Sequence, residues 1–78
     1  MRKRTLKLLI TFHTTTGAMA MEQYCRKENL PGRLIPVPTQ ITAGCGMAWC
    51  ATPESLSALQ SAVSNAGLDV QGWYEMLL

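Results

Sequence analysis

The sequence predicts an α+β fold in which a four-stranded antiparallel sheet carries two helices on one face. Three observations lead to this class. Apolar residues alternate over residues 5–13, they recur at helical spacing over residues 17–29 and 53–66, and shorter strand-like runs occupy residues 33–35, 45–51 and 70–76. The predicted order is β-α-β-β-α-β, within a single domain that spans residues 1–78.

The first strand has two chemically different faces, so we expect one of them to be the core face. Successive side chains of a strand point to opposite sides of the sheet. One face carries Leu6, Leu8, Ile10 and Phe12, and the other carries Lys7, Leu9, Thr11 and His13.

The first helix is predicted over residues 17–29. Thr14, Thr15 and Thr16 precede it and are all candidates for the N-cap. Its apolar stripe consists of Ala18, Met21 and Cys25, with charged residues outside it. We therefore expect Cys25 to be a core residue.

The next two strands are short and are separated by a proline-rich loop. Pro31-Gly32 ends the first helix region, and Pro36-Val37-Pro38 ends the strand at residues 33–35, because proline has no N–H to give to a ladder. In the strand at residues 45–51, Met47 and Trp49 lie opposite Gly46, Ala48 and Cys50. The pattern does not decide which of these faces is the core.

The second helix has the clearest signals in the chain. Thr52 is the expected N-cap, Pro53 the first helical residue, and Gly67 the end. Its apolar positions are Leu56, Leu59, Val63 and Ala66. A final strand at residues 70–76 then completes the order of elements known as the ferredoxin-like arrangement.

Composition and charge exclude several classes of function. Of the 78 residues, 47% are apolar and 15% are charged, and the net charge of +2 comes mainly from basic residues at the N-terminus. A nucleic-acid surface would need basic residues spread over a face with aromatic residues between them. No apolar stretch approaches the ~20 residues of a membrane span, and the polar residues after Ile10 interrupt any signal-peptide core. We therefore expect a cytoplasmic protein.

The cysteines fit neither a disulfide framework nor a metal site. Their number, three, is odd, and no Cys-x-x-Cys pair is present. Cys45 and Cys50 would be ~16 Å apart in an extended strand, too far for a disulfide. We accordingly expect no cofactor and no metal.

Cys45 is the candidate reactive residue, because Gly44 and Gly46 flank it and leave its thiol open to a partner. The predicted topology brings it to the end of the sheet where the first helix begins. A helix N-terminus favours a thiolate, which lowers the pKa of a nearby thiol. His13 could support the thiolate as a cation or a base, or could simply be a solvated polar residue; Thr14, Thr15 and Thr16 could bind an anionic group or act only as caps.

These features resemble the selenium/sulfur carrier protein-like family of small bacterial and archaeal proteins. The resemblance is carried by Ile10-Thr11-Phe12, Ala18, Glu22, the run from Gly32 to Pro38 that contains Pro-Val-Pro, and Cys45-Gly46. It implies a cytoplasmic protein that carries sulfur or selenium on Cys45 as a persulfide or selenopersulfide. The sequence departs from the family after this motif, where Met47-Ala48-Trp49-Cys50 ends in a further cysteine.

Two classes of function remain open. As a carrier, the protein would meet a sulfur- or selenium-delivering enzyme and an acceptor protein. As a binding or regulatory module, it would act through a homodimer or partner interface on the uncovered sheet face, with Trp49, Trp73 and Tyr74 as candidate contacts. Cys45 would then have no chemical role. A conventional enzyme is the weakest hypothesis, because the sequence contains no paired carboxylates, metal cluster or phosphate loop.

Overall fold

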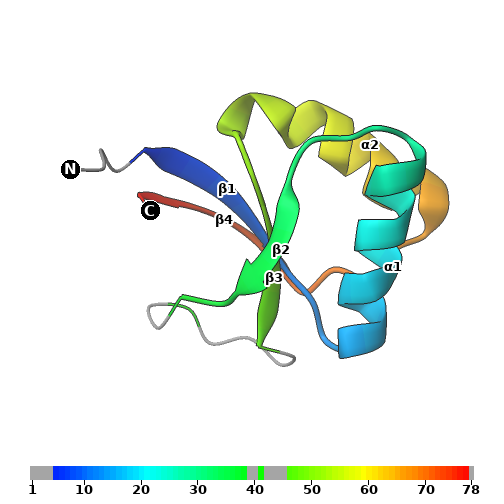
Figure 1. Cartoon of the computed structure of the whole chain (residues 1–78), viewed down its shortest axis with the longest axis horizontal. Helices are drawn as coiled ribbons and strands as arrows, with labels where there is room; N and C mark the ends of the chain where they lie inside the picture. The colour runs from blue at the N-terminus through cyan, green and yellow to red at the C-terminus, as the bar shows by residue number, and fades with distance from the viewer. Residues whose placement is uncertain (1–4, 39–40, 42–45, 78) are drawn as a thin grey trace.

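The computed structural model describes residues 5–38, 41 and 46–77, and it confirms an α+β fold with a four-stranded antiparallel sheet and two helices (Figure 1). The elements follow in the predicted alternation, with a short 3₁₀ turn, η1, before the second helix. Their bounds are β1 Leu6–Thr11, α1 Thr15–Lys27, β2 Arg33–Pro36, β3 Met47–Ala51, η1 Pro53–Ser55, α2 Leu56–Ala66 and β4 Gly72–Leu77.

The strands are ordered β2-β3-β1-β4, so β1 and β3 are the central strands. All three pairings are antiparallel. Ile10 of β1 faces Trp49 of β3 on one side and Trp73 of β4 on the other. The first and third strands along the chain are therefore neighbours in the sheet.

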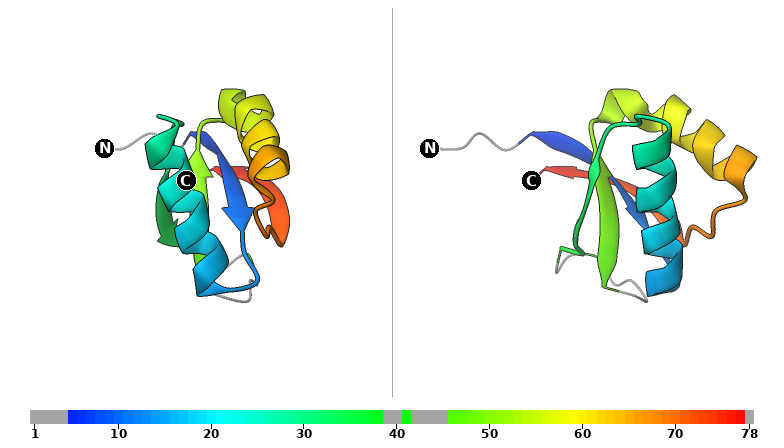
Figure 2. Two further views of the ribbon diagram at one scale, coloured as in Figure 1. Left: turned by 90° about the vertical axis from the view of Figure 1, so that its right-hand side faces the viewer. Right: turned by 45° about the vertical axis from the view of Figure 1, so that its right-hand side comes forward.

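Both helices lie on the same side of the sheet (Figures 1 and 2). The core between the helices and the sheet contains side chains from β1, β3, α1 and α2. Its buried members are Leu8, Ile10, Phe12, Ala18, Met21, Cys25, Trp49, Ala51 and Leu59. The prediction that Cys25 is a core residue is confirmed, since it is 1% exposed.

The expectation of a single core face on the first strand is wrong. Leu9 and Thr11 lie on the sheet face away from the helices and are nonetheless fully buried, as is Ala48 of β3. Leu6, by contrast, belongs to the helix side by its alternation but is 46% exposed near the start of β1. The alternation gives the faces correctly, but burial on the second face depends on packing between distant segments.

The structure also decides where the aromatic residues of the sheet lie. Trp49 is in the core, and Trp73 of β4 is partly buried and packs against the core cluster. Tyr74 faces Leu9 on the opposite side of the sheet and is 38% exposed. The expectation that all three aromatic residues could share the uncovered face is therefore wrong, because neighbouring residues of β4 point to opposite faces.

Helix α1 begins and ends two residues earlier than predicted. The Thr14 hydroxyl accepts a hydrogen bond from the Gly17 N–H (3.1 Å), which confirms a threonine N-cap. At the other end Asn29 has a φ of +56° and the Leu30 N–H donates to the Cys25 carbonyl (2.8 Å). This is a Schellman motif, which ends the helix before the proline.

The start of the second helix also differs from the prediction. Residues Pro53–Ser55 form the 3₁₀ turn η1, and α2 begins only at Leu56. The Thr52 hydroxyl lies 3.0 Å from that of Ser55 and makes no capping bond to the backbone. Gly67, with a φ of +65°, ends the helix as predicted.

Candidate functional site

The predicted reactive residue, Cys45, and its neighbour Gly44 lie outside the described residues. Gly46 follows them in the sequence and has a φ of +76°, a left-handed conformation that favours glycine. Its carbonyl accepts a hydrogen bond from the Val37 N–H (3.0 Å), next to the pair that Pro36 forms with Met47. Gly46 therefore lies at the entrance to β3, beside the end of β2.

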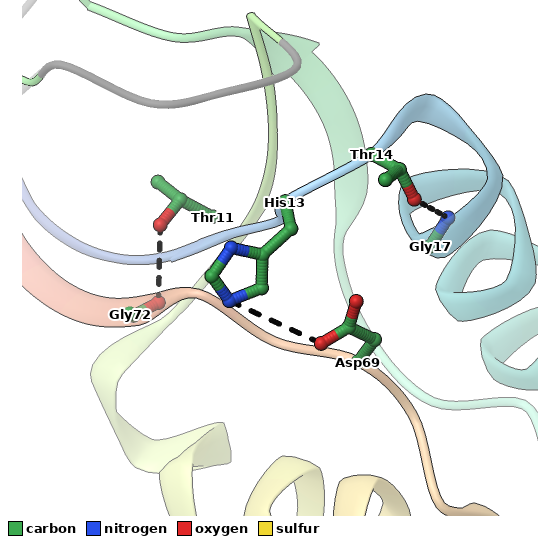
Figure 3. Close-up of polar contacts among 6 residues, drawn as sticks. All are labelled: Thr11, His13, Thr14, Gly17, Asp69 and Gly72. Carbon is green, nitrogen blue, oxygen red and sulfur yellow. Dashed lines mark hydrogen bonds and ion pairs between the residues drawn. The ribbon is translucent and has the colours of Figure 1, made fainter.

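The predicted supporting residues lie at this same end of the sheet. Thr11 is the last residue of β1 and pairs with Ala48, near the start of β3. The segment that leads from β1 to His13 therefore begins at the same end of the sheet as Gly46, which precedes β3. His13 points towards Asp69, and their Nε2 and Oδ1 atoms are 4.0 Å apart (Figure 3). The structure thus brings His13 and Asp69 together at this end of the sheet.

The His13–Asp69 contact is open to solvent. The two side chains are 55% and 63% exposed. An exposed pair at this distance contributes little stability and is screened by salt. His13 is therefore available to a partner molecule.

The N-terminus of α1 provides a positive electrostatic potential at this end of the molecule. The first N–H groups of a helix have no partner within the helix, and the aligned peptide dipoles place about half a positive charge there. The Thr14 hydroxyl satisfies the Gly17 N–H, and the first turn contains no acidic residue to offset the dipole. Thr15 and Thr16 lie in this turn and are exposed. An anion near this turn would be stabilised.

The two described cysteines differ in their access to solvent. Cys25 is buried in the core, and burial raises the pKa of its thiol from 9.0 to about 11. Because the thiolate is the reactive form, Cys25 is chemically protected. Cys50 is half-buried, and both thiols are free.

Cys50 has surroundings that the sequence did not reveal. It lies in an open hollow of about 330 Å³ that is also lined by Lys7 and Arg33. These three residues come from three different strands, and only the observed register places them together. No local sequence pattern carries that information.

Other kinds of site find no support in the described part of the chain. No group of three or more His, Cys, Asp or Glu side chains is arranged to hold a metal ion there. Within the same residues, neither helix has the length and apolar character needed to cross a bilayer.

The fold and its thiols thus define a small α+β domain with a free, partly exposed cysteine and an electropositive helix start. The chain belongs to the family described as Putative Se/S carrier protein-like, whose model matches residues 7–75. The resemblance found in the sequence is therefore confirmed. No curated protein and no solved structure matched the chain.

Proposed function

We propose that this protein carries sulfur or selenium as a persulfide or selenopersulfide on Cys45. The observation that carries the proposal is the family match, which covers residues 7–75 and so includes the Cys45-Gly46 motif. Of the other thiols, Cys25 is protected by its burial. The family description names a carrier, and a carrier needs a thiol that partner proteins can reach.

The loading step is a transfer between thiols. The Cys45 thiolate attacks the outer sulfur of a donor persulfide, R–S–SH. A bond forms between the Cys45 sulfur and that outer sulfur, the S–S bond of the donor breaks, and R–S⁻ leaves with the electron pair. The product is Cys45–S–SH. A thiolate of the acceptor protein then attacks the outer sulfur in the same way, and Cys45 leaves as the thiolate.

The geometry around Gly46 supports this chemistry. The start of α1, with exposed Thr15 and Thr16, lies at the end of the sheet where β3 begins. Its dipole would stabilise both the thiolate and the negatively charged persulfide. Gly44 and Gly46 would leave room for a donor on both sides of Cys45, and His13 would add positive charge when protonated.

We also propose a fold arrangement, a cellular location and a set of partners for the carrier. The order of elements and the two helices on one side of the sheet support a ferredoxin-like arrangement. A carrier thiol needs reducing surroundings, which favours the cytoplasm. Its partners would be a sulfur- or selenium-delivering enzyme and an acceptor protein, with no role for nucleic acid or a membrane.

The alternative is a binding or regulatory module that pairs through the open sheet face. The structure supports it less than the sequence did. Trp49 and Trp73 belong to the helix side, and Leu9, Thr11 and Ala48 are already buried on the open side within one chain. Less apolar surface is left for a partner than the sequence suggested. Sedimentation would test it, since this module would be a tight dimer with an unreactive Cys45.

The proposal is tested by loading the native protein from a small-molecule persulfide donor. After alkylation and digestion, peptide masses show which of the three cysteines has gained a sulfur. We expect the gain at Cys45 in the wild type, its loss in Cys45→Ser, and its retention in Cys50→Ser. Equal loading of wild type and Cys45→Ser would refute the proposal.

A reactivity profile serves as the second measurement. Competitive alkylation across pH should show Cys45 reacting at pH values well below the pKa of an ordinary thiol, while Cys25 stays protected. A Cys45 that titrates like a free thiol would contradict the role proposed for the start of α1.

A further inference from the structure

The hollow around Cys50 lies on the sheet face away from the helices. Trp49 and Ala51 are in the core on the helix side, so Cys50 between them points the other way. The hollow measures about 330 Å³. This volume is at the lower end of the range for small-molecule sites.

Two cationic side chains flank the thiol from neighbouring strands. Arg33 of β2 is directly opposite Cys50 in the register, and Leu9 of β1 is opposite Cys50 on its other side. Lys7 lies two residues before Leu9, and so it is diagonal to Cys50 on the same face. Side chains in directly opposite and diagonal positions are ~5 to 8 Å apart at their Cβ atoms, within reach of one small ligand.

The charges of these two residues are not neutralised within the described part of the protein. None of the described residues that line the hollow is acidic. The ion pairs of the described residues join His13 to Asp69 and Arg26 to Glu22, and they do not involve Lys7 or Arg33. A thiol and two cations that form no ion pair with any described residue therefore share one open hollow, which would attract an anion that carries a reactive sulfur.

We propose that this hollow is a second thiol site, in which Cys50 exchanges with low-molecular-weight disulfides that bear carboxylates. The Arg33 guanidinium is suited to hold a carboxylate through two parallel hydrogen bonds, and the Lys7 ammonium supplies a second positive charge. The ligand class is thus an anionic disulfide, R–S–S–R. The inference concerns a different cysteine from the proposed carrier thiol and does not depend on it.

The exchange step balances without any further reagent. The Cys50 thiolate attacks one sulfur of R–S–S–R, forming a Cys50–S–S–R bond and breaking the S–S bond of the ligand. The departing R–S⁻ takes the electron pair and binds the proton that Cys50 released. The Cys50 sulfur is oxidised and the departing sulfur is reduced.

The test compares an anionic and a cationic disulfide, oxidised glutathione and cystamine, in the Cys45→Ser variant of the full chain. Mass analysis of peptides gives the rate of mixed-disulfide formation at Cys50, and each rate is divided by that of the same reagent with a small free thiol. We expect the normalised rate to be about tenfold higher for oxidised glutathione, and to fall as salt is added. Cys25, buried in the core, is the internal control and should remain unmodified.

Charge-removing variants locate the effect. Arg33→Gln and Lys7→Gln should each lower the normalised rate with oxidised glutathione severalfold and raise that with cystamine. Arg26→Gln, which removes the same charge from the exposed surface of α1, is the matched control and should change neither rate. Equal normalised rates for the two disulfides, equal effects of Arg33→Gln and Arg26→Gln, or modification of Cys25 as fast as that of Cys50 would overturn the proposal.

Discussion

Gly32 is the residue at which a single added methyl group should damage the fold most. It has a φ of +120°, and a Cβ atom built there would lie 2.7 Å from Trp49 Cε2 and 2.8 Å from the Cys50 carbonyl oxygen. The Trp49 ring is 3% exposed and its Nε1–H donates to the Pro31 carbonyl (3.1 Å). The ring therefore cannot move aside without losing core contacts and this hydrogen bond.

The cost of Gly32→Ala follows from these two effects. A non-glycine residue in such a backbone conformation costs ~1–3 kcal/mol. An indole N–H left without its partner in the core costs a further ~1–3 kcal/mol. We expect a total loss of about 3 kcal/mol, a large part of the ~4–12 kcal/mol that a domain of this size has.

Gly67→Ala provides the matched control. Gly67 also has a positive φ, +65°, but a Cβ atom there would meet nothing within 4 Å. Its replacement should cost only the backbone term, ~1–2 kcal/mol. Urea unfolding followed by circular dichroism gives both free energies, and the steric argument is refuted if Gly32→Ala loses no more stability than Gly67→Ala.

Three further predictions concern the helix start, the buried thiol and the exposed ion pair. Thr14→Ala should lower the free energy of unfolding by ~1 kcal/mol because it removes the cap of α1, while Thr14→Ser should cost much less; equal losses in urea unfolding would contradict the cap. The pKa of Cys25 is about 11 in the folded chain against an ordinary 9.0, so the native state keeps a proton that the unfolded chain loses. Stability should therefore fall by roughly 2–3 kcal/mol as the pH rises from 9 to 11, and Cys25→Ala should lack this fall; parallel pH profiles would show that the thiol is not responsible. Asp69→Asn should change stability by less than about 0.5 kcal/mol, since its 4.0 Å contact with His13 is exposed, and a larger loss in thermal unfolding would reveal a role that this geometry does not explain.

The elements were predictable because their signals are local. Alternation predicted β1, the apolar stripe with Cys25 predicted α1, and Gly67 predicted the end of α2. The errors at the helix ends are local as well. They arise because Asn29 adopts a left-handed conformation and because Pro53–Ser55 form a tighter turn before α2.

The face of β3 and the surroundings of its cysteine were not predictable. A strand with Trp49 on one face and Cys50 on the other fits a core on either side, and only the contacts of Trp49 with the helices decide between them. The hollow around Cys50 needs Lys7 and Arg33 from two other strands, brought together by pairing between distant segments. The role of Cys45 as the carrier thiol remains a prediction that the loading experiment tests.

The pairing of β1 with β4 has a consequence for how the protein reaches its native state. Leu6 pairs with Leu77 and Thr11 with Gly72. The central strand β1 therefore gains its second neighbour from β4, the strand most distant from it in the sequence. During synthesis β4 must leave the ribosome before this pairing can form, and until then Ile10 lacks the cover of Trp73. Contacts between such distant segments slow folding and expose an unpaired strand meanwhile. On the growing chain, one edge of β1 therefore stays unpaired until β4 has emerged.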